Sequence, residues 1–294
     1  MADPLTPVAD TQLGAFTRGQ ALRHYSPRQV RTRLASGQWV RVFHGVYRFH
    51  TAAPSAQLRV TAAGLSLGKA VTACLHTAAE LHGFAIFDAA ATHVIADPGH
   101  PRRFGLIVHS TGLTAKDVCR YTGVPATTAE RTAVELARTL PRLDGLAALD
   151  AALRAGVVSS RSLNMELARH SHQRGVVVAR ELVALADGRA ESPMESRSRL
   201  RCIDGGLPSP ELQIEVRAGH RCYRLDMGWR AQKVGLEYDS LTFHGSHATL
   251  RHDRERHNWL TAQGWTIVYA TARQTLSAPE ELITQIARAL DAAG

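Results

Sequence analysis

Paired cysteines, long apolar runs and a leader-like start are all missing from this sequence of 294 residues. Its four cysteines lie far apart without a CxxC pair, which argues against a zinc ribbon or a disulfide framework. No apolar run approaches the roughly 18 residues of a membrane-spanning helix, and no basic-then-apolar signal opens the chain. We therefore expect a cytoplasmic protein with no membrane partner.

Positive charge is unevenly distributed along the chain, whose formal net charge is +9. Residues 1–50 hold seven arginines and two aspartates, whereas residues 191–294 hold 13 basic and 13 acidic residues. An excess of arginine at one end indicates a polyanionic partner, most simply DNA. A solvated, arginine-rich surface without a partner is the alternative interpretation.

The first segment, residues 1–52, is predicted to be a winged helix-turn-helix. Ser26 and Pro27 form a helix-start signal, Gly37 ends that helix, and the following residues 38–49 predict a β-hairpin. This order places the helix in a major groove and the hairpin near phosphates. A helical cap with a solvated arginine face is the alternative. The residues expected to contact DNA are Arg28, Gln29, Arg31, Thr32, Arg41 and Arg48.

The second segment, residues 53–188, is alanine-rich and is predicted to be a mostly helical accessory domain. Two strands are expected near residues 92–96 and 104–110. Its histidines lack ligand spacing backed by acids or cysteines, so they are expected to be structural. These histidines are His76, His82, His93 and His109.

The third segment, residues 189–294, is predicted to contain a helix, three strands, a helix, a strand and a helix, which makes the whole chain α/β. Two strands alternate apolar with polar residues, and a two-residue turn between them pairs Trp229 with Val234. In that register Asp226 falls opposite Glu237, and like charges directly opposed destabilise a sheet.

Three carboxylates thus gather on one polar face, those of Asp226, Glu237 and Asp239. A fourth acid, Glu195, lies in the first turn of the preceding helix. A bound divalent cation is the expected reason for this convergence. A hairpin face with solvated acids is the alternative interpretation.

The third segment resembles the PD-(D/E)XK nuclease core, and more closely the very-short-patch-repair-like endonuclease domains. The resemblance implies an αβββαβ restriction-endonuclease-like core that hydrolyses DNA with Mg²⁺, for which Mn²⁺ substitutes. The matching stretches are Glu191-Ser192-Pro193-Met194-Glu195-Ser196, Arg224-Leu225-Asp226, Gly235-Leu236-Glu237-Tyr238-Asp239, His244, Arg251-His252-Asp253-Arg254-Glu255-Arg256 and Gly264-Trp265.

That resemblance also implies roles for individual residues. Asp226 and Glu237 would be ligands of the metal, and Glu195 would hold a metal-bound water or tune the site. Asp239 stands where the family pattern has lysine, so it is expected to be a third metal ligand or to bind a second cation. The missing positive charge is expected from the following helix or from His244, which is also a candidate general acid. The candidates for that charge are Arg251, Arg254 and Arg256.

The front of the chain resembles the AbiEi family of antitoxins over about residues 10–160. This resemblance implies a winged helix that binds promoter DNA in toxin–antitoxin operons, followed by an accessory domain. The matching stretches are Gly37-Gln38-Trp39-Val40-Arg41-Val42, Gly45-Val46-Tyr47-Arg48, His76-Thr77-Ala78-Ala79-Glu80-Leu81-His82-Gly83 and Thr127-Thr128-Ala129-Glu130-Arg131-Thr132.

Two hypotheses follow. The favoured one is a metal-dependent DNA endonuclease positioned by the winged helix. The alternative is a DNA-binding transcriptional regulator of antitoxin type, with a toxin as partner and a degenerate nuclease fold.

Overall fold

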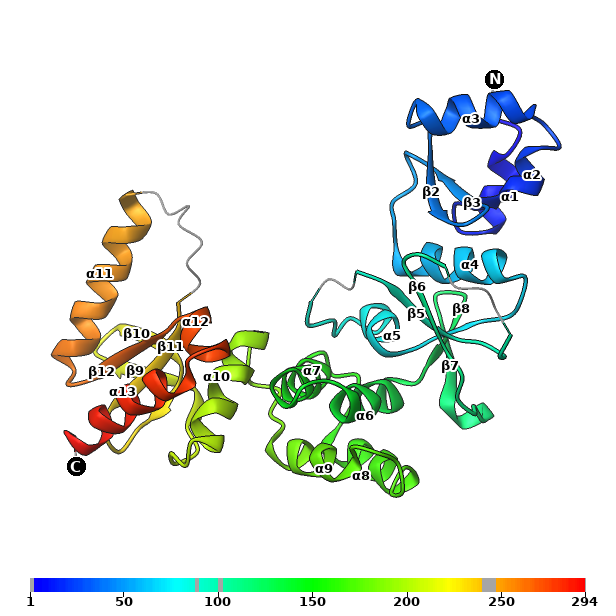
Figure 1. The fold of residues 1–294 in the computed structure, drawn as a ribbon. Helices are drawn as coiled ribbons and strands as arrows, with labels where there is room; N and C mark the ends of the chain where they lie inside the picture. The colour runs from blue at the N-terminus through cyan, green and yellow to red at the C-terminus, as the bar shows by residue number, and fades with distance from the viewer. Residues whose placement is uncertain (1–2, 88–89, 100–102, 240–246, 294) are drawn as a thin grey trace. The chain divides into compact units, whose positions relative to one another are not determined.

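The described part of the chain is a mixed α/β fold with three β-sheets (Figure 1). Its contacts divide it into two units, residues 1–136 and residues 137–294. The predicted domain boundaries at residues 52 and 188 fall inside these units and stay predictions. None of the described helices is long and apolar enough to cross a membrane. The computed structural model describes residues 3–87, 90–99, 103–239 and 247–293.

The first unit begins with three short helices and a three-stranded antiparallel sheet in the order β1-β3-β2 (Figure 1). Aromatic side chains fill the core between them. Phe16 lies edge-on to Trp39 with 5.0 Å between ring centroids, and Tyr47 is buried beside them. The elements are α1 (Thr6–Thr11), β1 (Ala15–Thr17), α2 (Arg18–Ala21), α3 (Pro27–Ala35), β2 (Trp39–Phe43) and β3 (Val46–Phe49).

Local sequence signals account for α3 and for the hairpin of β2 and β3. The backbone N–H of Gln29 donates to the Ser26 hydroxyl, and the Ser26 N–H donates to the Gln29 side chain. This capping box satisfies two N–H groups that a helix start leaves unpaired. Gly37 after the helix and Gly45 in the hairpin turn both have positive φ, which glycine adopts at no steric cost. The helix predicted from Pro27 and the predicted hairpin are both present.

A five-stranded sheet in the order β6-β5-β4-β8-β7 forms the rest of the first unit. Helices α4 to α9 make residues 53–188 mostly helical, as predicted, but the strands β4, β7 and β8 were not predicted, because such short strands give little periodic signal. The strands predicted near residues 92–96 and 104–110 are present as β5 and β6. The elements are α4 (Ala56–Leu67), β4 (Thr72–Ala73), α5 (Leu75–Leu81), β5 (Thr92–Ile95), β6 (Leu106–His109), the 3-10 helix η1 (Ala115–Asp117), β7 (Val118–Tyr121) and β8 (Val124–Thr127).

One apolar core joins the hairpin to this sheet. Phe43 and Val46 of the hairpin belong to the same buried cluster as Leu58 and Val60 of α4 and Val94 of β5. Helix α4 lies between the two sheets (Figure 1). Because these residues leave water together, the hairpin is anchored to the sheet through α4.

The next part of the chain is helical, and α6 (Ala129–Thr139) runs from the first unit into the second. In the second unit a buried ion pair joins α7 to α10. Arg199 Nη2 lies 2.8 Å from Asp150 Oδ2, and these side chains are 5% and 0% exposed. The helices are α7 (Arg142–Arg154), α8 (Ser160–Arg169), α9 (Val176–Leu185) and α10 (Pro193–Asp204).

The strands that carry Asp226 and Glu237, β10 and β11, belong to a four-stranded sheet in the order β12-β11-β10-β9. Strands β9, β10 and β11 are antiparallel, and β11 pairs with β12 in parallel. Trp229 pairs with Val234, as predicted. A Cβ added to Gly228 would lie 2.3 Å from the Val234 carbonyl oxygen, so only glycine fits there. The elements are β9 (Glu211–Ala218), β10 (Arg221–Trp229), β11 (Val234–Tyr238), α11 (His247–Ala262), β12 (Thr266–Ala270), α12 (Ala272–Leu276) and α13 (Pro279–Asp291).

Candidate nucleic-acid interface and acidic cluster

Helix α3 presents two arginines to solvent. Arg28 and Arg31 are exposed, and between described residues no hydrogen bond or ion pair engages either guanidinium group. Two further predicted contacts have local roles, because the Gln29 side chain closes the capping box and the Thr32 hydroxyl donates to the Arg28 carbonyl. The guanidinium groups of Arg28 and Arg31 can therefore bind an external anion.

A third arginine of this helix has a structural role. The guanidinium carbon of Arg33 lies 4.0 Å from the centroid of the Tyr25 ring and 5.6 Å from that of Trp39. A cation above an aromatic face is attracted by the electron density of the ring. Arg33 thus ties α3 to the aromatic core, whereas its neighbours on α3 point to solvent.

The two predicted arginines of the hairpin differ in the same way. Arg48 Nη1 donates to the carbonyl oxygens of Phe49, His50 and Ala52 at 3.0, 3.2 and 2.6 Å. Arg41 on β2 is exposed, and no hydrogen bond or ion pair to a described residue engages its guanidinium. Arg48 therefore holds the chain that leaves the hairpin, whereas the Arg41 side chain is open to solvent.

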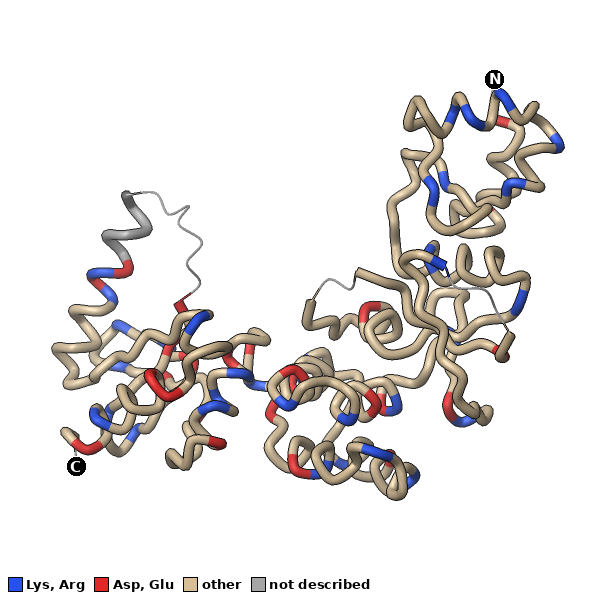
Figure 2. Tube along the Cα trace, viewed as in Figure 1, with Lys and Arg blue, Asp and Glu red and all other residues tan. Residues whose placement is uncertain are grey.

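Acidic residues are scarce around these arginines, as Figure 2 shows along the N-terminal elements. Asp3 and Asp10 are the two acids among residues 1–50. The Asp3 carboxylate accepts the Leu5 N–H at 2.9 Å. Two further arginines, Arg18 and Arg23, are also exposed in this part. The field at the surface is therefore positive, which attracts a polyanion.

The acidic cluster consists of Asp226 on β10, Glu237 on β11 and Glu195 on α10, and each of these acids has a partner within the protein. The Asp226 carboxylate accepts the Tyr238 N–H at 3.0 Å. Glu195 Oε2 accepts the Glu191 N–H at 2.9 Å and the Gln213 side-chain amide at 3.1 Å. Each carboxylate is thus bonded to a donor from the protein.

Glu237 is paired with an arginine. Arg256 Nη1 donates to Glu237 Oε2 at 2.7 Å, and its Nη2 contacts the other carboxylate oxygen. The same Nη2 donates to the carbonyl of Arg224 at 2.8 Å. A guanidinium bound to both carboxylate oxygens is a strong, directional ion pair. Among the three arginines predicted to supply charge here, the structure brings Arg256 to the cluster.

Burial shifts the proton affinity of the central acid. The pKa of Asp226 is raised from its usual 3.8 to about 6, chiefly by desolvation and in addition by the nearby Glu195 and Glu237 carboxylates. The Tyr238 N–H and the Arg256 guanidinium oppose this shift. The bond to Glu237 raises the pKa of Arg256, which stays charged.

The remaining predicted site residues are exposed or lie outside the described residues. Asp239 is exposed, and its backbone N–H donates to the Ala270 carbonyl at 2.9 Å. Arg254 is exposed on α11. His244 lies outside the described residues, as does the side chain of Arg251.

The cluster in this arrangement does not fit a divalent cation. Mg²⁺ prefers carboxylate oxygens and water, but both oxygens of Glu237 contact a guanidinium and Asp226 is bonded to a backbone N–H. Binding of Mg²⁺ or Mn²⁺ by these acids stays a prediction.

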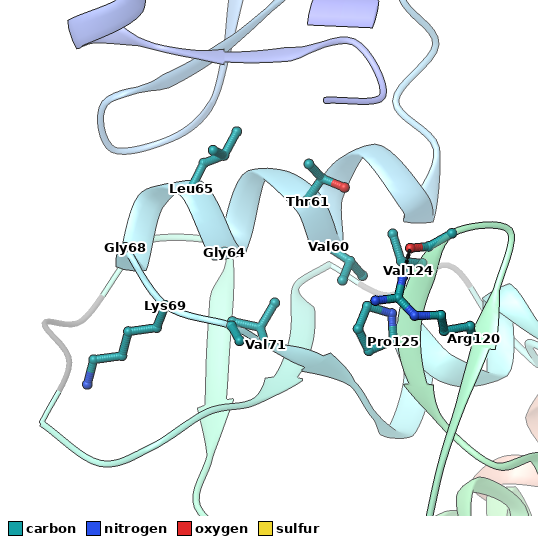
Figure 3. Close-up of a pocket in the computed structure, with 12 residues that line it drawn as sticks. Val60, Thr61, Gly64, Leu65, Gly68, Lys69, Val71, Arg120, Val124 and Pro125 are labelled. Carbon is teal, nitrogen blue, oxygen red and sulfur yellow. Dashed lines mark hydrogen bonds between the residues drawn. The ribbon is translucent and has the colours of Figure 1, made fainter. Parts of the chain in front are cut away.

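A separate hollow of about 590 Å³ lies between α4 and the turn that joins β7 to β8 (Figure 3). Two cationic side chains line it, and each donates to a backbone carbonyl. Lys69 Nζ lies 3.1 Å from the Pro98 carbonyl oxygen, and Arg120 Nη1 lies 3.0 Å from that of Gly123. With both cations engaged, this hollow is assigned no function.

Comparison with known proteins gives two family matches. Residues 3–50 match the family described as "Transcriptional regulator, AbiEi antitoxin". Residues 71–185 match the "AbiEi antitoxin C-terminal domain". The chain belongs to the AbiEi antitoxin family. The N-terminal match coincides with α1 to β3, and the second match begins before β4 and ends with α9.

Two curated relatives of this AbiEi-family chain come from Mycobacterium tuberculosis, strains CDC 1551 / Oshkosh and ATCC 25618 / H37Rv. Each is described as an uncharacterized protein. Each is 39% identical to this chain over 268 residues, which cover 90% of this chain and 97% of the relative. The similarity thus extends well beyond the two matched domains.

The family assignment corrects the favoured hypothesis. The prediction of a metal-dependent DNA endonuclease is wrong, because the matched domains are those of an antitoxin and transcriptional regulator. The predicted fusion to a very-short-patch-repair-like nuclease is likewise unsupported. The structure offers a physical reason. The acids that resemble a PD-(D/E)XK motif are bonded to protein donors, and an arginine neutralises Glu237.

Proposed function

We propose that this chain is a DNA-binding transcriptional regulator of antitoxin type. Residues 3–50 would act as a winged helix-turn-helix, with α3 in the major groove and the β2–β3 hairpin as the wing. The observation that carries the proposal is the pair of exposed arginines, Arg28 and Arg31, on a capped helix that directly precedes a hairpin. The match of the same residues to an AbiEi transcriptional regulator supports it.

The arginines of this domain have two roles in the proposal: some contact DNA and others hold the domain together. Arg28 and Arg31 approach base edges or phosphates from α3, and Arg41 contacts a phosphate from the wing. The Arg33 and Arg48 side chains hold the domain in shape, through the Tyr25 ring and the carbonyls after β3. The helix thus reaches DNA on a rigid support, which limits the entropy lost on binding.

The test is fluorescence anisotropy with a labelled duplex from the promoter of the chain's own operon. The variant Arg28→Ala/Arg31→Ala is expected to weaken binding by about 1–3 kcal/mol for each arginine that reads a base edge. Its matched control is Arg161→Ala/Arg180→Ala, which removes the same charge from exposed positions on α8 and α9. Equal affinity of both double variants would contradict the proposal.

A protein partner completes the antitoxin proposal. Members of toxin–antitoxin operons occur as pairs, so a toxin encoded by the neighbouring gene is the expected partner. Co-expression of the two genes, followed by size-exclusion chromatography of the complex, tests this. Independent elution of the two proteins at micromolar concentration would count against a stable pair.

The four-stranded sheet has a supporting role in the proposal. Its αβββαβ order would be a restriction-endonuclease-like scaffold without nuclease chemistry, in which the guanidinium group of Arg256 takes the place of a metal ion. The acids would then contribute to stability, and Mg²⁺ would have no effect on the protein at millimolar concentration.

A further inference from the structure

Strand β6 forms one edge of the five-stranded sheet, and in the described part of the chain no strand lies beyond it. Its backbone groups alternate in direction along the strand. The Ala96 N–H donates to the His109 carbonyl oxygen at 3.2 Å, so the backbone groups of His109 point toward β5. Successive residues of a strand direct their N–H and C=O groups to opposite sides. The backbone groups of Val108 and Ser110 therefore point away from the sheet, to its open edge.

Most of the backbone groups at this edge have no partner among the described residues. No backbone hydrogen bond engages the Ser110 N–H, and none outside the sheet ladder engages Val108. The Leu106 N–H differs, because it donates to the Arg103 carbonyl oxygen at 3.2 Å in the turn before the strand. An edge strand with unpaired N–H and C=O groups is a template for another strand.

The sequence around β6 has none of the features that usually prevent two edges from pairing. Residues 104–114 contain no lysine, arginine, aspartate, glutamate or proline. Ile107, in the middle of the strand, is an apolar side chain that is 43% exposed. The opposite edge of the sheet differs, because β7 carries the exposed Arg120. Charge on an edge strand discourages pairing, so β6 is the edge of this sheet that suits a partner.

A fully exposed aromatic side chain stands directly before this edge. Phe104 is 103% exposed, the highest exposure among the large apolar side chains of the described residues. Aromatic side chains are enriched among the residues that contribute most to binding at protein interfaces. Burial of the Phe104 ring would remove a large apolar surface from water. The ring and the open edge thus favour the same partner surface.

A second copy of β6 in antiparallel orientation matches these features. With a two-fold axis at Val108, the N–H and C=O of Val108 meet the same groups of the second copy, and each Leu106 carbonyl meets a Ser110 N–H. The start of one strand then lies beside the end of the other. Phe104 is thereby brought to residues 110–112 of the second copy, whose side chains are small. No charged side chains are opposed in this register, so like-charge repulsion is absent.

Pairing of β6 with β7 of another copy fits less well. Such a contact joins two different edges, and it continues from copy to copy into an open fibre unless a ring closes. It would also place the exposed Arg120 in the interface. The two-fold arrangement uses both free edges at once and closes with two copies.

We propose that β6 is a dimerisation edge, at which two copies of this chain join their five-stranded sheets into one continuous sheet. The strand is short, so the dimer is weak in solution. On DNA the dimer becomes stronger, because winged helices bound to neighbouring half-sites hold the two copies at a high effective concentration. This gain on DNA rests on the proposed function, whereas the pairing of the edges does not.

Sedimentation velocity of the full-length protein without DNA tests the pairing separately from DNA binding. The wild type is expected to show a reversible monomer–dimer equilibrium at concentrations up to about 100 µM. Arg28→Ala/Arg31→Ala, which lacks the proposed DNA contacts, is expected to dimerise like the wild type. A wild type that stays monomeric throughout this range would overturn the proposal, whatever its affinity for DNA.

Two side-chain variants test whether the dimer uses this edge. Phe104→Ser and Ile107→Lys are each expected to raise the dissociation constant of the dimer by about tenfold or more. Because Phe104 is fully exposed, Phe104→Ser is expected to keep the thermal midpoint of the wild type. The matched control is Val177→Lys, at a position on α9 that is 63% exposed, and it is expected to dimerise like the wild type. Unchanged dimerisation of both Phe104→Ser and Ile107→Lys would overturn the proposal.

A backbone variant tests the hydrogen bonds of the edge directly. Ser110→Pro removes the N–H that points to the open edge, because proline has no backbone donor. Ser110→Ala keeps that N–H and removes the same hydroxyl, so it is the matched control. The proline variant is expected to weaken the dimer by about tenfold or more, and the alanine variant to leave it unchanged. Equal dissociation constants for the two variants would overturn the proposed pairing.

Discussion

The arginines of α3 and the acids of the four-stranded sheet are both clusters of charge, but the fold treats them in opposite ways. Arg28 and Arg31 are exposed, and among described residues nothing pairs with them. Glu237 and Asp226 accept bonds from Arg256 and from the Tyr238 N–H. In the proposed regulator the unpaired charge at the surface binds DNA, whereas the charge paired inside the protein stabilises the fold.

This difference also explains why the acids suggest a metal site when only the sequence is known. Three carboxylates with strand alternation resemble a metal site because the sequence shows the acids but not their donors. Arg256 follows Glu237 by 19 positions, and the helix α11 brings it back onto the sheet. A closely packed ion pair thus occupies the place that a metal would take.

The largest effect is expected where paired charge is most deeply buried. Arg199→Met leaves the Asp150 carboxylate, which is 0% exposed, without its ionic partner. Removal of one member of a buried pair costs about 3–5 kcal/mol. Urea unfolding of the full chain measures the loss. The exposed Arg180→Met is the control and is expected to change stability by less than about 0.5 kcal/mol. Similar losses in both variants would break the comparison.

Arg256→Met is expected to have the next largest effect. It removes the bonds to both oxygens of Glu237 and leaves that carboxylate close to Asp226 and Glu195. Charge-assisted bonds contribute about 1.5–3 kcal/mol each to stability, and the partial exposure of the pair places the expected loss near 2 kcal/mol. Urea unfolding measures this loss too.

The effect of Mg²⁺ on thermal stability is a second test of this ion pair. In the wild type, millimolar MgCl₂ is expected to leave the thermal midpoint unchanged, because Arg256 already neutralises Glu237. A rise in the midpoint of the wild type in MgCl₂, but not in an equal ionic strength of NaCl, would show that these acids bind the metal after all.

The raised pKa of Asp226 predicts that the free energy of unfolding depends on pH, by about as much as it changes in Arg256→Met. Its pKa in the folded protein, about 6, lies above the usual 3.8, so the folded state holds this proton more strongly. The contribution to stability is present below about pH 4 and is lost as the pH rises to about 6. Asp226→Asn does not titrate. Between about pH 4 and pH 7.5 its stability relative to the wild type is expected to rise by about 2 kcal/mol. A constant difference across that range would contradict the assignment.

The two hairpin arginines offer a smaller test inside one domain. Arg48→Ala removes donors from three carbonyl oxygens and is expected to cost about 1 kcal/mol of stability. Arg41→Ala is expected to leave stability within about 0.5 kcal/mol and to weaken DNA binding instead. Thermal melts and anisotropy on the same two samples measure both effects. The reverse pattern would place Arg48 at the DNA and Arg41 in the fold.

Features set by neighbouring residues could be predicted from the sequence. Ser26, Pro27 and Gln29 start α3, and Gly37 ends it, through bonds that span three or four positions. The turn between β10 and β11 fixes the pairing of Trp229 with Val234 for the same reason. The exposed arginines of α3 follow directly from its apolar positions, since the buried Val30 sets the inner face.

Features that depend on distant parts of the chain could not be predicted. The contact of His93 with His109 requires the parallel register of β5 and β6, which no local signal specifies. Strand β4 has two residues and pairs with β8, far along the chain, so its pattern is too short to detect. The partner of Glu237 depends on how α11 crosses the sheet.

The salt dependence of DNA binding tests the central claim most directly. The logarithm of the association constant falls linearly with the logarithm of the salt concentration, with a slope of about −0.9 for each phosphate neutralised. Arg28→Ala/Arg31→Ala is expected to make this slope shallower by about two, while Arg161→Ala/Arg180→Ala and Asp226→Asn keep the slope of the wild type. A slope unchanged by the loss of Arg28 and Arg31, or no binding of the wild type at low salt, would contradict the account.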